Sequence, residues 1–279
     1  MNEKQLIKKA LDYGIPSSTV AQALRFRRIL GEPTEFLKRR SEAQRIAATS
    51  PYANVIDKTK GYGRFGPNDF PGIMDAVAAA NRIRESKTLD GKFKKPFFVN
   101  LLEPADLDNN PELLALARSR PVLEAAAAYL GTVPELSGIG VFLSPANQSL
   151  EKSQQYHTDD VDTTQVKCFV NCNDIGPNNG PFTFITADAS DALRRKLKHG
   201  WRGPRLSDED VTKNCSPEDV VSITGGPGHG VLVDSSRCLH FGSRCREGYR
   251  LVIMFQLTRR PSLAIESDNP RGRTLIIDH

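Results

Sequence analysis

Short apolar runs of strand length, separated by turn-forming residues, recur from residue 95 to residue 257. The clearest is RLVIMFQL, from Arg250 to Leu257, whose length and content of β-branched and aromatic residues indicate a buried strand. The other runs cover residues 95–102, 136–144, 165–173, 181–186 and 229–234. A chain that places this many short strands in one stretch is predicted to build a mainly β core.

The rest of the chain is predicted to add helices to this core. Residues 1–90 have helical periodicity over most of their length, and 188–220 form an insertion with a basic helix at 192–199. With 279 residues and an ordinary globular composition, the chain is expected to fold as a single domain, whose β core spans residues 95–260.

A metal-binding pair stands in the middle of the chain, at His157-Thr158-Asp159. On an extended strand, side chains two residues apart share a face, so His157 and Asp159 are expected to point into the same space. With a distant histidine they complete the two-His, one-carboxylate triad of non-haem Fe(II) oxygenases. So short a motif also arises by chance, so the surrounding sequence must show whether this pair binds a metal.

That context lies downstream, where a glycine-rich turn and an apolar segment lead to His240, and Arg250 opens the last strand. Guanidinium groups stay charged and bind carboxylates bidentately, so a buried Arg250 would indicate a site for an organic anion. A solvated strand end, or an internal ion pair with an aspartate, would equally account for this arginine.

Together these residues resemble the phytanoyl-CoA dioxygenase family of Fe(II)/2-oxoglutarate-dependent oxygenases. The resemblance rests on His157-x-Asp159, on Asn179-Gly180-Pro181, and on His240 followed ten residues later by Arg250. It implies a double-stranded β-helix, the jelly-roll barrel also found in cupins, with His157, Asp159 and His240 as metal ligands and Arg250 as the partner of 2-oxoglutarate. The chain departs from the family pattern at residues 186–189, on the substrate side.

The resemblance also implies the cofactors and the reaction. Fe(II), 2-oxoglutarate and O2 would be used to oxidise a small-molecule substrate, with succinate and CO2 as co-products. Hydroxylation is the default outcome, and desaturation or ring chemistry stays open. A cupin-type metalloenzyme that does not use 2-oxoglutarate would share the metal residues but would leave Arg250 without a role.

Lys167 is a further candidate for the site. On the strand 165–173, Lys167 shares a face with Phe169, and Val166 and Cys168 lie on the other face. If the apolar face packs outward on helices, Lys167 points into the barrel and can meet a carboxylate of the cosubstrate or substrate. If the strand lies at an edge, Lys167 is solvated.

The net charge of +5 arises within the first 50 residues, which hold ten basic and five acidic side chains. The spacing of Ala10, Gly14 and Val20 fits a helix-turn-helix, with Arg25 after its second helix, which would indicate a binding module for nucleic acid. We favour amphipathic helices that pack on the barrel and turn a basic face to water, so nucleic acid is not expected as a partner. The same face would attract an acidic substrate.

Two segments outside the predicted strands are candidates for covering the site. Residues 50–70 are rich in glycine, proline and aromatic residues, which favours either a lid or a loop anchored by its aromatic side chains. The insertion 188–220, with the single tryptophan Trp201, is expected to overhang the site and select the substrate. Of the other histidines, His229 is the rival third ligand, and His199 is expected to be solvated.

Neither an export signal nor a membrane span is predicted, since no apolar run approaches the required length. Five cysteines, an odd number without a CxxC pair, are expected to be reduced thiols in a cytoplasmic protein.

Overall fold

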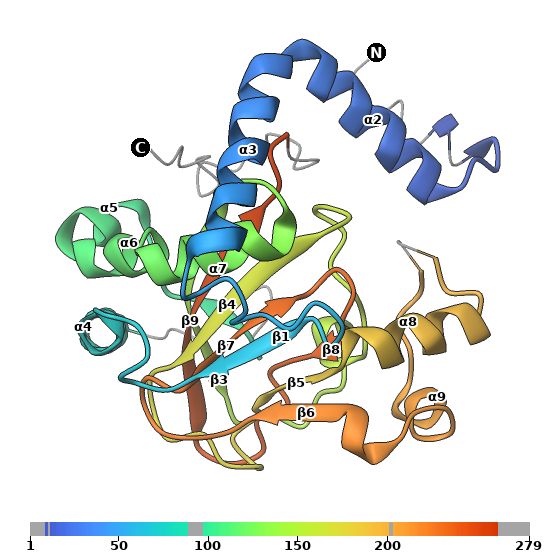
Figure 1. Ribbon diagram of the computed structural model, residues 1–279. Coiled ribbons are helices and arrows are strands. Elements are labelled where there is room, and N and C mark those ends of the chain that lie inside the picture. The colour runs from blue at the N-terminus through green and yellow to red at the C-terminus, as the bar shows by residue number, and fades with distance from the viewer. Residues whose placement is uncertain (1–8, 11, 89–96, 201–202, 262–279) are drawn as a thin grey trace.

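Two antiparallel sheets form the centre of the protein in a computed structural model that describes residues 9, 10, 12–88, 97–200 and 203–261 (Figure 1). The larger sheet has the order β1-β7-β4-β9-β3-β2 and the smaller one β6-β5-β8. The strands are β1 Tyr62–Phe65, β2 Val99–Asn100, β3 Glu135–Pro145, β4 Gln165–Asn171, β5 Phe182–Ile185, β6 Val220–Ile223, β7 Gly230–Asp234, β8 His240–Phe241 and β9 Tyr249–Thr258.

The α-helices lie outside the sheets. They are α2 Ser17–Gly31, α3 Pro33–Thr49, α4 Ile73–Ser86, α5 Pro104–Asn109, α6 Pro111–Ala117, α7 Arg120–Leu130, α8 Ala187–Lys196 and α9 Asp208–Thr212, with short 3-10 turns at Lys152–Gln154 and Pro217–Asp219. No helix in the described ranges combines the length and the apolar character needed to cross a bilayer.

The inner faces of the two sheets pack against each other. Their shared core includes Phe169 on β4, Phe182 and Phe184 on β5, and Val231 on β7. The rings of Phe169 and Phe182 stack across the gap with centroids 4.2 Å apart. Strand alternation therefore sends every second side chain of β4 and β9 into the space between the sheets, where the site is built.

Helices α4, α6 and α7 cover the outer face of the larger sheet. Val166, Cys168 and Val170 of β4 join the buried cluster that these helices complete, so the apolar face of β4 does pack outward. Because side chains alternate along a strand, Lys167 points inward. Of the two positions that the sequence allows for Lys167, the structure therefore has the one at the site and not the solvated one. The cysteines are free thiols, and Cys168 acts as a small buried apolar residue.

Helices α8 and α9 cover the outer face of the smaller sheet, where Ile185 and Leu239 pack with Leu193 and Val211. Two isolated bridges continue this sheet beyond β8. His157 pairs with His240, and Tyr156 pairs with Leu206. These bridges add two short extended segments to the edge of the sheet.

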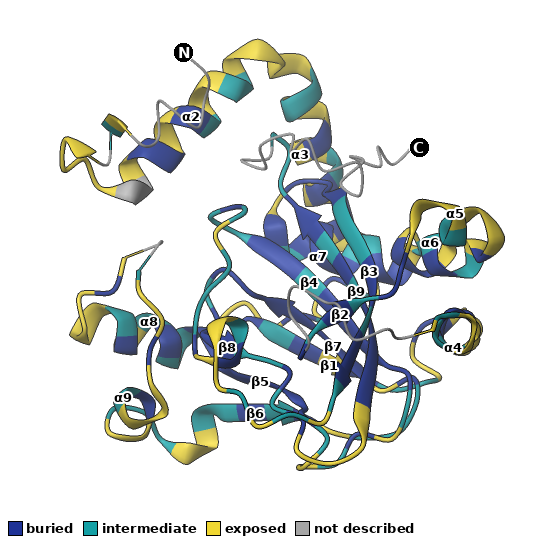
Figure 2. Ribbon diagram, turned by 180° about the vertical axis from the view of Figure 1, so that it is seen from behind, coloured by how far each residue is buried: buried dark blue, intermediate teal, exposed yellow. Residues whose placement is uncertain are grey.

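The N-terminal helices differ in how they contact the core. Helix α3 packs on α7 through a small buried cluster that includes Ala43 and Ala127, whereas α2 is largely exposed (Figure 2). Arg25 lies in the middle of α2 and forms an ion pair with the buried Asp162. Arg25 therefore lies inside the helix, not after it as the helix-turn-helix interpretation places it, and it contacts this protein's own chain.

Several predicted boundaries also change. Residues 62–65 form β1, an edge strand paired with β7, and their aromatic side chains pack inside the protein, so the segment 50–70 is anchored and does not provide a lid. A side chain at Gly63 would meet the carbonyl oxygen of Val55 at 1.7 Å, so this close approach requires glycine. In the described part of the predicted strand 95–102, β2 covers Val99–Asn100 and one further hydrogen bond joins Leu101 to Val141, whereas residues 89–96 lie outside the described residues. The basic helix of the insertion begins at Ala187.

Candidate metal and cosubstrate site

The two histidines of the site are cross-strand partners. The backbone nitrogen of His157 donates to the carbonyl of His240 at 3.0 Å, and the reverse bond measures 2.9 Å. Directly paired residues on antiparallel segments project their side chains to the same face. The two imidazole rings consequently face the space between the sheets, with centroids 4.4 Å apart.

A second hydrogen bond fixes each ring. Nδ1 of His157 lies 2.8 Å from the carbonyl oxygen of Gln155, and Nδ1 of His240 lies 2.9 Å from that of Cys238. A carbonyl accepts a hydrogen, so each Nδ1 carries the proton and each Nε2 keeps its lone pair free. This is the arrangement found around metal-binding histidines.

Asp159 completes the group. Its backbone nitrogen donates to the carbonyl of Ser235 at 2.8 Å, which holds the turn against the end of β7. One carboxylate oxygen lies 3.5 Å from Nε2 of His240 and 2.7 Å from the ammonium of Lys167. One donor atom each from His157, Asp159 and His240 lies within 4.8 Å of the others. His157 and Asp159 thus point into the same space, as their spacing of two residues predicts.

The surroundings keep all three groups in the form that binds a cation. Burial lowers the pKa of His240 to about 3, with the neighbouring His157 as the next cause, and burial also lowers the pKa of His157. Burial favours the neutral form of Asp159, but the charge of Lys167 holds the pKa of this carboxyl below its usual value. The group therefore presents two neutral imidazoles and one carboxylate.

Arg250 lies at the inner end of the same cavity, on β9 opposite Ser144 of β3. It is 1% exposed, so the solvated interpretation is wrong. Its Nε and Nη2 have no hydrogen-bond partner among the described residues, and no carboxylate of that part of the chain pairs with it. Burial lowers the pKa of Arg250 to about 10, so the group is still charged at neutral pH. A buried charge without a partner is energetically costly, so this guanidinium is expected to bind an anion.

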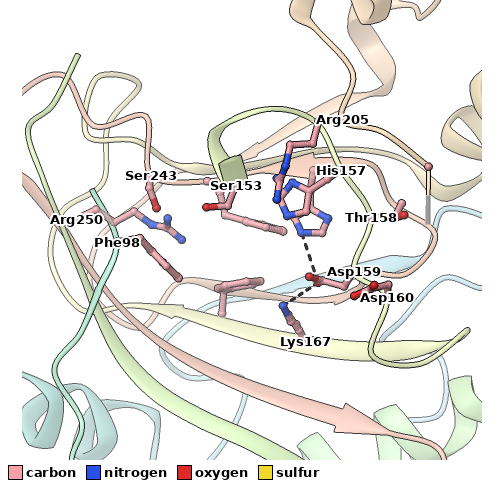
Figure 3. Close-up of a pocket in the computed structure, with 15 residues that line it drawn as sticks. Phe98, Ser153, His157, Thr158, Asp159, Asp160, Lys167, Arg205, Ser243 and Arg250 are labelled. Carbon is pink, nitrogen blue, oxygen red and sulfur yellow. Dashed lines mark ion pairs between the residues drawn. The ribbon is translucent and has the colours of Figure 1, made fainter. Parts of the chain in front are cut away.

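The cavity that joins these groups has a volume of about 420 Å³. Phe98, Phe169 and Phe182 line it with apolar surface. In Figure 3, Arg250 and Phe98 lie at one end, Asp160 lies at the other, and His157 lies between them. The size and the few convergent polar groups are typical of a small-molecule site.

The other predicted site features have mixed outcomes. Gly203 and Arg205 line the cavity, so the insertion 188–220 does reach the site, while Trp201 lies outside the described residues. His229 is exposed in its turn, away from the cavity lining, so the rival third ligand is excluded. His199 is buried and its Nε2 contacts the carbonyl of Pro204, so the expectation that it is solvated was wrong.

Sequence comparison does not assign the chain to a family, because no family model and no curated protein matches it. Solved structures do match its fold. The non-haem alpha-ketoglutarate-dependent epimerase SnoN from nogalamycin biosynthesis is 16% identical, with a TM-score of 0.51 over 85% of this chain and 93% of that one. The related carbocyclase SnoK is 13% identical, with a TM-score of 0.51 over 76% and 85%.

A third match is EctD from S. alaskensis, solved with 2-oxoglutarate and 5-hydroxyectoine. It is 16% identical to this chain, with a TM-score of 0.54 over 82% of this chain and 84% of that one. At such low identities the likeness concerns the fold alone. The chain thus has a fold that is used by enzymes dependent on iron and 2-oxoglutarate.

Proposed function

We propose that the protein is a non-haem Fe(II) oxygenase that uses 2-oxoglutarate as cosubstrate to oxidise a small molecule. The observation that carries this proposal is the convergence of a two-His, one-carboxylate group and a buried, unpaired arginine in one cavity. The two packed antiparallel sheets support the assignment to the double-stranded β-helix of such enzymes. The likeness in fold to SnoN, SnoK and EctD supports the same assignment.

The donor set fits ferrous iron. His157, Asp159 and His240 would hold the metal through two imidazole Nε2 atoms and one carboxylate oxygen, which leaves coordination positions for other ligands. The Nδ1 hydrogen bonds to the carbonyls of Gln155 and Cys238 keep both rings oriented before a metal arrives. Little rearrangement of the chain is therefore required for metal binding.

The cosubstrate would span from the metal to Arg250. The Nε and Nη2 atoms of Arg250, which have no partner among the described residues, offer a bidentate contact for its distal carboxylate. Lys167 is the candidate for a second contact, because its ammonium lies 2.7 Å from the carboxylate oxygen of Asp159 and so beside the metal position. This pairing also keeps Asp159 ionised.

When bound, iron with 2-oxoglutarate and O2 supplies oxidative decarboxylation of the cosubstrate and abstraction of a hydrogen atom from the substrate. The chain's own residues orient the reactants and exclude water. Phe169 and Phe182 form an apolar wall beside His240, with the Phe182 and His240 ring centroids 5.3 Å apart. Such a wall strengthens the charged contacts of Lys167 and Arg250 and protects reactive species from solvent.

Hydroxylation is the outcome that we propose. The names of SnoN, an epimerase, and SnoK, a carbocyclase, indicate that other outcomes occur on this fold. Product analysis with a confirmed substrate distinguishes these outcomes.

Succinate formation from 2-oxoglutarate, with Fe(II) and O2, tests the proposal when the metal content is measured in parallel. The parent protein should bind about one iron and release succinate above the rate without protein. Asp159→Ala should lose both properties. Asp160→Ala, a matched change one residue along the chain, should keep the iron. Iron retention by Asp159→Ala together with its loss from Asp160→Ala would contradict the assigned ligand.

The alternatives account for less of the site. A cupin-type metalloenzyme that does not use 2-oxoglutarate leaves the burial of Arg250 unexplained. A binding module that uses the basic N-terminal helices loses Arg25 as a contact, because Arg25 is paired with Asp162.

A further inference from the structure

Arg205, from the insertion 188–220, lies beside the metal position. Leu206 pairs with Tyr156 in an antiparallel bridge, and its nitrogen donates to the carbonyl of Tyr156 at 2.9 Å. This register sets Arg205 opposite His157. Tyr156 and Leu206 point outward into a buried cluster beneath α8 and α9, so Arg205 and His157 share the inner face. Figure 3 shows the two side chains adjacent to each other.

The guanidinium of Arg205 is anchored by a backbone carbonyl and has no anionic partner among the described residues. Its Nη1 donates to the carbonyl oxygen of Lys152 at 2.5 Å, which anchors one end of the group. Within the described ranges no carboxylate forms an ion pair with Arg205. The contact with Lys152 leaves the edge formed by Nε and Nη2, which has the geometry that binds a carboxylate bidentately.

The other cations of the cavity already have roles. Lys167 pairs with Asp159, and Arg250 lies at the far end, where the cosubstrate carboxylate would bind. Asp160 also lines the cavity, but in Figure 3 it lies on the other side of His157 from Arg205. Among the described residues that line the cavity, Arg205 is thus the cation that neither the metal ligands nor the cosubstrate requires.

We propose that Arg205 binds a carboxylate of the primary substrate, and that the substrate is a small organic acid with an apolar body. The carboxylate would sit at the mouth of the cavity, and the apolar part would extend toward the metal along Phe98, Phe169 and Phe182. This inference rests on the proposed function, because that function assigns Arg250 to the cosubstrate. It gives the insertion a specific role in substrate selection.

Matched pairs of acids and amides test the proposal directly. The probes are phenylacetate, 3-phenylpropionate and octanoate, each compared with its neutral primary amide. Binding to the full-length protein, loaded with Zn(II) as a redox-inert metal and with 2-oxoglutarate, is measured by calorimetry. We expect at least one acid to bind about tenfold more tightly than its amide, a modest gain because Arg205 is exposed.

Variants assign the preference to one residue. Arg205→Ala should remove the difference between acid and amide, and Arg205→Lys should keep part of it. Arg195→Ala, a change at an exposed arginine of the same insertion outside the cavity lining, should leave the difference intact. All three variants should bind 2-oxoglutarate as the parent does.

Several results overturn the proposal. They are equal binding of acid and amide by the parent, no binding of any probe at millimolar concentration, an unchanged acid preference in Arg205→Ala, and a loss of 2-oxoglutarate affinity in that variant. A parent that fails to bind 2-oxoglutarate contradicts the proposed function instead. In that case the acid and amide comparison on the metal-loaded protein still tests Arg205.

Discussion

Replacement of Arg250 by alanine separates 2-oxoglutarate use from every alternative that shares the metal group. Arg250 is 1% exposed and has no partner for Nε and Nη2 among the described residues, so a bound carboxylate would meet a poorly screened charge. Loss of one side of such a contact costs about 2 to 5 kcal/mol. This corresponds to a loss of about 30-fold to several thousand-fold in affinity for 2-oxoglutarate.

The assay is an anaerobic titration of the iron-loaded protein with 2-oxoglutarate, with iron content measured separately. Arg250→Ala should keep its iron, since the ligands lie on other elements, yet fail to saturate at concentrations that saturate the parent. Arg250→Lys should recover only part of the affinity, because an ammonium lacks the planar fork. Arg246→Ala, a nearby exposed change, serves as the matched control.

Folding must be checked, because Arg250 is among the largest fully buried side chains. If the alanine variant is unfolded, Arg250→Met fills more of the space and keeps the test available. An unchanged affinity for 2-oxoglutarate in a folded Arg250→Ala or Arg250→Met protein would refute the assignment of Arg250.

Two further predictions concern Lys167 and Arg25. Lys167→Met should weaken 2-oxoglutarate binding by about tenfold in the same titration, less than Arg250→Ala, because its charge is already shared with Asp159; an unchanged affinity would limit Lys167 to that ion pair. Arg25→Ala should lower the free energy of unfolding by about 3 kcal/mol in urea, because it leaves the buried Asp162 unpaired. The exposed Arg27→Ala is its control, and an equal effect of both changes would argue against the ion pair.

The parts of the site that follow strand alternation could be predicted from the sequence. His157 and Asp159 share a face because they are two residues apart, and Lys167 points inward because Val166 and Cys168 pack on helices. The sequence also places Arg250 at the head of the last strand, but it does not decide whether the side chain is buried, since a solvated strand end has the same local sequence.

The missed features depend on distant contacts. Strand β1 lies in a glycine-rich and proline-rich segment, and it is extended because β7 pairs with it. Arg25 meets Asp162 across a separation of 137 residues, which no local pattern reveals. Arg205 lies next to His157 through a single bridge at Leu206, so its place at the site depends entirely on tertiary structure.

The most direct test of the central claim is an anaerobic titration of the parent protein with Fe(II) and then 2-oxoglutarate, followed by visible absorption. A 2-oxo acid that chelates ferrous iron gives a weak metal-to-ligand charge-transfer band. We predict that this band appears and saturates at one 2-oxoglutarate per bound iron, and that it is absent from Asp159→Ala. Iron binding without such a band at saturating 2-oxoglutarate would contradict the account, because a metal centre would then be present without its cosubstrate.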